Sequence, residues 1–105
     1  MVELWTLEFH GTRVQSFIGG LDDDRAHDEA NALIRLLGVR GNRLSEPRSK
    51  SLGDGLFELR GKEVRIFYTF RPGRRIVLLD GMIKKRQDIP KEVLRRLHKL
   101  LRDVS

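Results

Sequence analysis

Basic side chains recur on three consecutive strand-like runs in the second half of the chain. They are Arg60 on the first run, Arg65 on the second, and Lys84, Lys85 and Arg86 after the third. A guanidinium presents a rigid fork of N–H donors that grips phosphate oxygens in pairs. A small antiparallel sheet that carries arginines where its side chains leave the core therefore predicts phosphate binding, with RNA or DNA as the ligand.

Cleavage of RNA by its own 2′-hydroxyl is the reaction that these residues would support. It needs a base to take the hydroxyl proton, cations to stabilise the pentavalent phosphorane, and an acid for the leaving 5′-oxygen. Arg60 and Arg65 are the candidates for balancing the phosphate charge, and a lysine or Glu58 is the candidate base. The reaction requires no metal or other cofactor, and the chain has no cysteine and no pair of histidines at metal-ligand spacing.

The same residues also allow a purely structural interpretation. Glu58 and Arg60 share one face of their strand, and Arg65 is expected across the hairpin, so the three would form a cross-strand ion network. The cluster Lys84–Arg86 would then be a solvated strand end. Tyr68 alternates with apolar positions and is expected in the core rather than at a site.

The positive charge is concentrated in one part of the chain. Residues 1–47 hold five Arg against eight Asp and Glu, a net of −3, whereas residues 48–105 hold sixteen Lys and Arg against seven acids, a net of +9; the two sum to +6. This asymmetry predicts a polyanion or an acidic partner bound at one end of the molecule. A solvated basic surface without a ligand would have the same composition.

Length and composition predict one domain over residues 1–105. Without cysteines, disulfides and thiolate metal sites are excluded. No apolar run approaches the roughly 20 residues of a membrane span, and the N-terminus lacks the basic and apolar regions of a signal peptide. A cytoplasmic protein with no membrane partner is expected.

Hydrophobic periodicity predicts the elements that position the basic residues. Before residue 52 these are a strand over residues 2–9, a short helix over residues 10–18, a second helix that starts at the aspartates 22–24 and stops at Gly38, and a polar loop over residues 40–51. Glycines and aspartates at the helix ends supply the stop and capping signals.

A three-stranded antiparallel meander and a last helix are expected after this loop. The strands are residues 56–60, 64–70 and 76–79, with turns at Gly61-Lys62 and Pro72-Gly73. The last helix has Pro90 as its first residue, buries a row of Val and Leu side chains and turns Arg95, Arg96, Lys99 and Arg102 outward. The predicted fold class is α+β, with Arg60 and Arg65 pointing away from the core.

The strings LGDGLFELR, VRIFYTF and IVLLDGMIKKRQDIP resemble the RelE/ParE toxin superfamily, and within it the phage-derived HigB-like branch. That branch has an aromatic-Glu-Leu-Arg strand, then an Arg-containing strand with a Tyr, then an apolar strand that ends in a Lys-Lys pair before a helix headed by Pro. The order of elements also agrees, and the likeness covers nearly the whole chain. It implies a small RelE-like fold and a toxin of a type II toxin–antitoxin pair.

The resemblance implies a role for individual residues. Family residues fall on Arg60, on Arg65, on the pair Lys84 and Lys85 with Arg86 beside it, and on Lys50. Together with Glu58 from the chemical argument above, the expected catalytic residues are Arg60, Arg65, Glu58 and Lys85, and the expected RNA- or phosphate-binding residues are Lys50, Lys84 and Arg86. Two positions depart from the family pattern: the chain has Asp80-Gly81-Met82 where the branch has His-Gly-Phe, and Glu58 where the well-studied RelE toxins have a lysine. The identity of the general base is therefore open.

The resemblance also implies partners and alternatives. The partners are a cognate antitoxin, expected to be a helix-turn-helix protein, together with the ribosome and mRNA. Most such toxins cut mRNA in the ribosomal A site, and some relatives poison DNA gyrase without cutting RNA. An inactive regulatory binding module is the third possibility, and the strand arginines favour the endoribonuclease.

Overall fold

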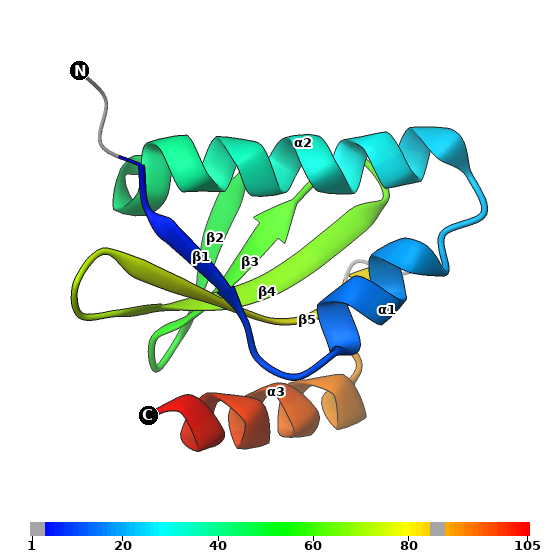
Figure 1. Ribbon diagram of the computed structural model, residues 1–105. Coiled ribbons are helices and arrows are strands. Elements are labelled where there is room, and N and C mark those ends of the chain that lie inside the picture. The colour runs from blue at the N-terminus through cyan, green and yellow to red at the C-terminus, as the bar shows by residue number, and fades with distance from the viewer. Residues whose placement is uncertain (1–3, 85–87) are drawn as a thin grey trace.

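One twisted sheet separates helices that lie on its two faces. The computed structural model describes residues 4–84 and 88–105. Its strands are β1 (Thr6–Phe9), β2 (Ser49–Gly53), β3 (Leu56–Arg60), β4 (Val64–Arg71) and β5 (Arg75–Ile83), and its helices are α1 (Arg13–Gly19), α2 (Asp24–Arg40) and α3 (Lys91–Val104). In Figure 1, α2 crosses one face of the sheet and α3 lies against the other. The predicted α+β class, the helical hairpin and the C-terminal helix are confirmed.

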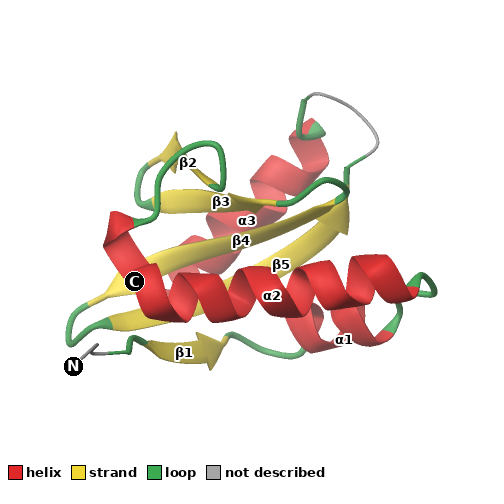
Figure 2. Cartoon of the chain, turned by 90° about the horizontal axis from the view of Figure 1, so that it is seen from above, coloured by secondary structure: helices red, strands yellow, loops and turns green. Residues whose placement is uncertain are grey.

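The strand order in the sheet is β1-β5-β4-β3-β2. The strands β2 to β5 pair antiparallel in sequence order, and β1 joins β5 in parallel. The turns of the predicted meander lie at Gly61-Lys62 and Pro72-Gly73, as expected. Figure 2, seen from above, shows α2 crossing over the strands and α3 beyond the sheet.

Each face of the sheet has its own apolar core. The core under α1 and α2 is formed by Val14, Ala26, Ala30, Leu33, Leu37, Leu59, Val64, Ile66, Tyr68, Ile76 and Leu78. The core under α3 is formed by Leu56, Phe67, Val77, Leu79 and Leu97. Alternate residues of β4 and β5 enter opposite cores, so these central strands are covered on both sides.

An edge strand, β2, takes up the end of the expected polar loop, from Ser49 onward. Its polar sequence shows no apolar alternation, and an edge strand tolerates this because it has one neighbour only. Ser49 is nevertheless buried, and its hydroxyl forms a hydrogen bond with the hydroxyl of Tyr68. Lys50 is exposed and lies directly opposite Glu58 on β3. The sheet therefore has one more antiparallel strand than the predicted meander.

The second helix does not stop at Gly38 but continues to Arg40. Gly38 gives room to β1: a Cβ there would lie 3.3 Å from Leu7 Cδ1, and the Trp5 N–H donates to the Gly38 carbonyl at 2.9 Å. Gly41 is the C-cap of the helix; it has a φ of 53°, and a Cβ there would lie 2.0 Å from Trp5 Nε1. The end of the helix is thus set by packing of the N-terminal segment.

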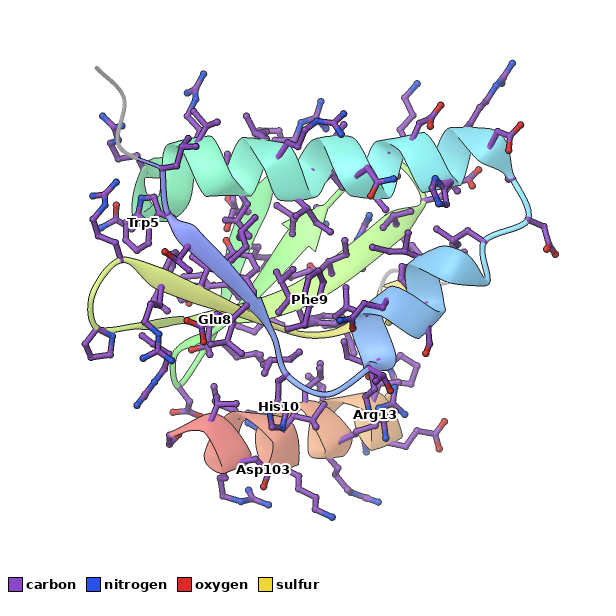
Figure 3. The ribbon with its side chains drawn as sticks, in the orientation of Figure 1. Trp5, Glu8, Phe9, His10, Arg13 and Asp103 are labelled. Atoms are coloured by element: carbon purple, nitrogen blue, oxygen red, sulfur yellow. The ribbon has the colours of Figure 1, made fainter. Side chains whose placement is uncertain are left out.

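The remaining differences concern the ends of elements. The strand β1 begins at Thr6 and α1 at Arg13, so His10 lies in the connection between them. Its Nε2 atom is 3.8 Å from Oδ2 of Asp103 on α3, and Figure 3 shows the His10 side chain directed at that helix. Pro90 is the N-cap of α3 rather than its first residue. None of the helices in the described ranges is long and apolar enough to cross a bilayer.

Arg96 turns toward the sheet, although an outward position was expected. Its Nε donates to Asp80 Oδ2 at 2.8 Å, and the Asp80 side chain is buried. A β-bulge in β5 opposite Phe67 explains the contact, because the extra residue brings Leu79 and Asp80 to the same face of the sheet. A carboxylate in that position requires a cation. The other basic residues of α3 that were predicted to point outward are exposed.

Candidate phosphate-binding site

A small hollow lies where β3, β4 and β5 meet the start of α3. Its volume is about 20 Å³, and it is lined by Glu58, Arg60, Arg65, Met82, Lys84, Asp88 and Ile89. Glu58, Arg60, Arg65 and Lys84 are residues that the sequence predicts at the site. We refer to this group of lining residues as the basic hollow.

Strand register brings these residues together. Arg60 on β3 is directly opposite Arg65 on β4, and Arg65 is directly opposite Met82 on β5. Residues that face each other across paired strands point to the same side of the sheet. The three residues therefore form one row across the sheet. Next to this row, the backbone N–H of Lys84 donates to the Glu63 carbonyl at 2.6 Å.

Glu58 lies between the two arginines. Its Oε1 is 3.4 Å from Arg60 Nε, and its Oε2 is 3.8 Å from Arg65 Nε. The exposed fraction of the side chain is 32% for Arg60, 6% for Arg65 and 8% for Glu58. Arg60 is therefore the arginine that a ligand can reach, and Arg65 is the fixed cation behind it.

Arg65 is buried, which corrects the expectation that its side chain leaves the core. The alternation in β4 does direct it away from α2, but α3 covers that second face. Its Nη1 donates to the carbonyls of Gly61 at 2.5 Å and Val64 at 3.0 Å. Burial lowers the pKa of Arg65, while the carboxylate of Glu58 acts in the opposite direction. The guanidinium remains charged in proteins, so it is a permanent cation beneath the hollow.

Glu29 holds the turn between β3 and β4 from the side of α2. Its carboxylate accepts the backbone N–H groups of Lys62 at 2.9 Å, Glu63 at 3.2 Å and Val64 at 3.0 Å. Partial burial raises the pKa of Glu29, but the three N–H bonds together outweigh it and hold the pKa below its ordinary value. No local pattern identifies this residue, because the contact joins segments more than thirty residues apart.

Of the other predicted site residues, the structure describes only Lys50. Lys50 points to the same face as Glu58 from the edge strand β2 and is exposed, but it does not line the hollow. Lys85 and Arg86 lie outside the described residues. Met82, Asp88 and Ile89 complete the lining and were not selected from the sequence. The last two approach only because the chain turns into α3 at this point.

Two further polar residues have structural partners instead. Asp80 takes the place of the family histidine, and its two carboxylate oxygens accept the Arg96 Nε–H and the Gly81 N–H. Tyr68 is 1% exposed, in the core as predicted. Burial raises the pKa of its hydroxyl, and the hydrogen bond with Ser49 partly offsets this.

His10 belongs to the opposite end of α3. That helix begins beside the basic hollow and ends near Asp103, the partner of His10. Its 14 residues span about 20 Å at 1.5 Å per residue. His10 is therefore separated from the arginines by the length of the helix.

The sequence of the chain matches the model of a known protein family. Residues 16–102 match the family model described as phage derived protein Gp49-like (DUF891). No curated protein matches the chain.

Two solved structures are similar in fold. One is a chain of the archaeal RelE-RelB complex from Pyrococcus horikoshii OT3, with a TM-score of 0.65 and 16% identity, covering 79% of this chain and 98% of that one. The other is a chain of the RelBE2 toxin–antitoxin complex from Mycobacterium tuberculosis, with a TM-score of 0.56 and 19% identity, covering 77% of this chain and 99% of that one. Since the family match spans most of the sequence, the chain belongs to the phage-derived Gp49-like family, and it has the RelE-like fold that its strand motifs predict.

Proposed function

We propose that this protein is the toxin of a type II toxin–antitoxin pair and that it cleaves mRNA at the ribosome by a metal-independent reaction. The family and the fold support a toxin, since both similar structures are chains of RelE–RelB or toxin–antitoxin complexes. The observation that carries the enzymatic part is the basic hollow, where Arg60, Arg65 and Lys84 gather around the carboxylate of Glu58, with Asp88 also in the lining. A surface that only binds a protein partner does not need a cluster of cations around a carboxylate.

In the proposed reaction the 2′-oxygen of the RNA attacks the adjacent phosphorus, and the bond from phosphorus to the 5′-oxygen breaks. The 2′-hydroxyl gives its proton to the base, and the leaving 5′-oxygen takes a proton from water. The products are a 2′,3′-cyclic phosphate and a free 5′-hydroxyl. Negative charge grows on the non-bridging oxygens as the phosphorane forms, and donors already fixed around that position lower the barrier. Arg60 and Lys84 contact these oxygens, and Arg65 adds its charge from beneath.

Glu58 is our candidate for the general base within the described residues. It is now engaged by Arg60 at 3.4 Å and by Arg65 at 3.8 Å. A phosphate that draws Arg60 away leaves Oε1 of Glu58 free to accept the 2′-hydroxyl proton. Lys85 is the remaining catalytic candidate, and Lys50 and Arg86 extend the binding surface along the RNA backbone.

The test is to incubate the purified protein with translating ribosomes and to map the new mRNA 5′ ends. Cleavage by the wild type, with 5′-hydroxyl ends, is the expected result. A gyrase supercoiling assay run in parallel distinguishes the main alternative. If induction arrests growth while mRNA stays intact and gyrase is inhibited, the proposal is wrong and the protein is a non-enzymatic gyrase poison.

We also propose that a cognate antitoxin neutralises the protein in the cytoplasm by covering the basic hollow. The charge balance of +9 over residues 48–105 supports an acidic or apolar segment as the covering element. Co-expression with the product of the neighbouring gene is expected to give a complex at low salt. If no complex forms, the proposal that this protein is half of a toxin–antitoxin pair loses its main support.

A further inference from the structure

The turn between β3 and β4 is fixed from two sides. On the α2 side, one carboxylate of Glu29 accepts three consecutive backbone N–H groups, from Lys62 to Val64. On the α3 side, Arg65 Nη1 donates to the carbonyls of Gly61 and Val64. Three N–H groups and two carbonyl groups at this turn therefore have side-chain partners.

Gly61 is shaped to admit the Glu29 carboxylate. A Cβ at this position would lie 2.3 Å from Glu29 Oε1 and 2.5 Å from its carboxyl carbon. The backbone of Gly61 does not have a positive φ, so space rather than conformation explains the glycine. The close approach and the three N–H bonds are independent signs that the carboxylate is seated in the turn.

The turn joins the two arginines of the proposed site. Arg60 precedes it and Arg65 follows it, and the two residues face each other in the β3–β4 register. Any opening of the turn moves the Gly61 carbonyl that Arg65 Nη1 binds, and it changes the separation of the two guanidinium groups. The position of Glu29 is therefore linked to the geometry of the basic hollow through a short covalent path.

We propose that Glu29 is a positioning residue: by seating its carboxylate in the β3–β4 turn, it sets the relative positions of Arg60 and Arg65. The catalytic consequence rests on the proposed endoribonuclease function, whereas the claim about the arginines does not. Misplacement of a catalytic group by about 1 Å can cost on the order of 10²-fold in rate. Electrostatic attraction of RNA acts over longer distances, so binding should change much less.

The primary test compares Glu29→Gln, Glu29→Ala, Gly61→Ala and the double variant Glu29→Ala/Gly61→Ala. Glu29→Gln keeps only one acceptor oxygen for the three donors. Gly61→Ala displaces the carboxylate without removing a charge. We expect each to lower kcat for RNA cleavage by about 10- to 100-fold, with KM changed by less than about threefold. The double variant should be no slower than Glu29→Ala alone, because Gly61 serves only to admit Glu29.

Asp28→Asn is the matched control. It removes a carboxylate from the next position of the same helix, and Asp28 is exposed. Its kcat should stay within about twofold of the wild type, as is usual for surface substitutions away from a site. An equal loss in Asp28→Asn and Glu29→Gln would show that the net charge of α2 matters and would overturn the positioning role.

A second readout does not depend on activity. The Nε–H of Arg65 should exchange slowly with water in the wild type, because the side chain is 6% exposed and bound to the turn. In folded Glu29→Gln, NMR should show this exchange accelerated by about tenfold or more as the turn opens locally. An unchanged rate would refute the proposal even if the protein never cleaves RNA. A wild type without cleavage would refute the proposed function alone.

Discussion

At the scale of single residues, burial separates two arginines that the sequence treats alike. Arg60 is about one-third exposed and Arg65 is almost fully buried. The alternation of β4 correctly directs Arg65 away from α2, but it cannot reveal that α3 covers the other face. Their substitutions should therefore have different consequences, one mainly for activity and the other mainly for stability.

Arg60→Ala should lower RNA cleavage by about 10²-fold or more, since in the proposed reaction it removes a donor to the phosphorane. The free energy of unfolding should change by less than about 1 kcal/mol, because a partly exposed ion pair contributes little. Arg60→Lys should not restore the rate, because an ammonium cannot grip two oxygens at once. Single-turnover cleavage and urea unfolding measure both quantities. Full activity in folded Arg60→Ala would make Arg60 a surface ion-pair residue.

Arg65→Ala should destabilise the protein by roughly 3 kcal/mol. Glu58 would stay buried with one arginine fewer, and the carbonyls of Gly61 and Val64 would lose their side-chain donor. Urea unfolding provides the measurement. Lys62→Ala, at an exposed position of the same turn, is the control and should stay within about 0.5 kcal/mol. Equal stability of the two variants would contradict the structural role given to Arg65.

At the scale of elements, local patterns predict the centre of the sheet and long-range contacts decide its margins. The apolar alternation of Val64–Phe70 and Ile76–Leu79 is strong, and both strands form as predicted. Edge strand β2 has no such pattern, because its pairing with β3 and the contact of Ser49 with Tyr68 hold it. The helix α2 passes Gly38 for the same reason, since packing against Trp5 and Leu7 overrides the local stop signal.

In the candidate site, too, local patterns predict some contacts and long-range packing decides the others. Strand register makes the convergence of Arg60 and Arg65 predictable from the hairpin alone. The seating of Glu29 is not predictable, because it depends on how α2 crosses the sheet. The hydrogen bond of Arg96 with Asp80 is also hidden from the sequence, since a β-bulge turns Asp80 toward α3.

The contact between α2 and the β3–β4 turn should depend on pH. The pKa of Glu29 is lowered from its ordinary value of 4.5 in the folded protein. Its contribution to stability is therefore fully present above about pH 4.5 and is lost as the pH falls from there through the folded-state pKa. The difference in unfolding free energy between wild type and Glu29→Gln should shrink below pH 4.5. Urea unfolding from pH 7 to pH 3 measures it, and a constant difference would mean that the ionised form is not what holds the turn.

Docking of α3 should depend on Arg96. Arg96→Ala leaves the buried carboxylate of Asp80 with the Gly81 N–H but without its cation. The loss in unfolding free energy should be about 1.5 to 3 kcal/mol, as for other hydrogen bonds to charged groups. Arg95→Ala, next along the helix and exposed, should cost no more than about 0.5 kcal/mol. If both variants are equally stable in urea, the contact is incidental to the position of α3.

At the scale of the whole molecule, the helices on the two faces of the sheet differ in charge. The helix α2 has three arginines against three acidic residues, a net charge of 0. The helix α3 has five Lys and Arg against two acidic residues, a net charge of +3. Because α2 and α3 lie on opposite sides of the sheet (Figure 1), an approaching acidic partner experiences attraction toward the α3 side.

Association with the antitoxin should therefore be steered by charge. Raising the salt concentration from about 50 to 500 mM should lower the association rate by about tenfold or more, with a smaller effect on dissociation. Lys84→Glu should slow association, because Lys84 is exposed at the mouth of the basic hollow. Asp22→Lys, at an exposed position before α2, is the control on the other face and should not slow it. Stopped-flow mixing with the neighbouring gene product measures these rates. If neither salt nor Lys84→Glu changes the association rate, the antitoxin binds elsewhere on the protein. The apolar groove between Trp5 and Val39 would then be the surface to test.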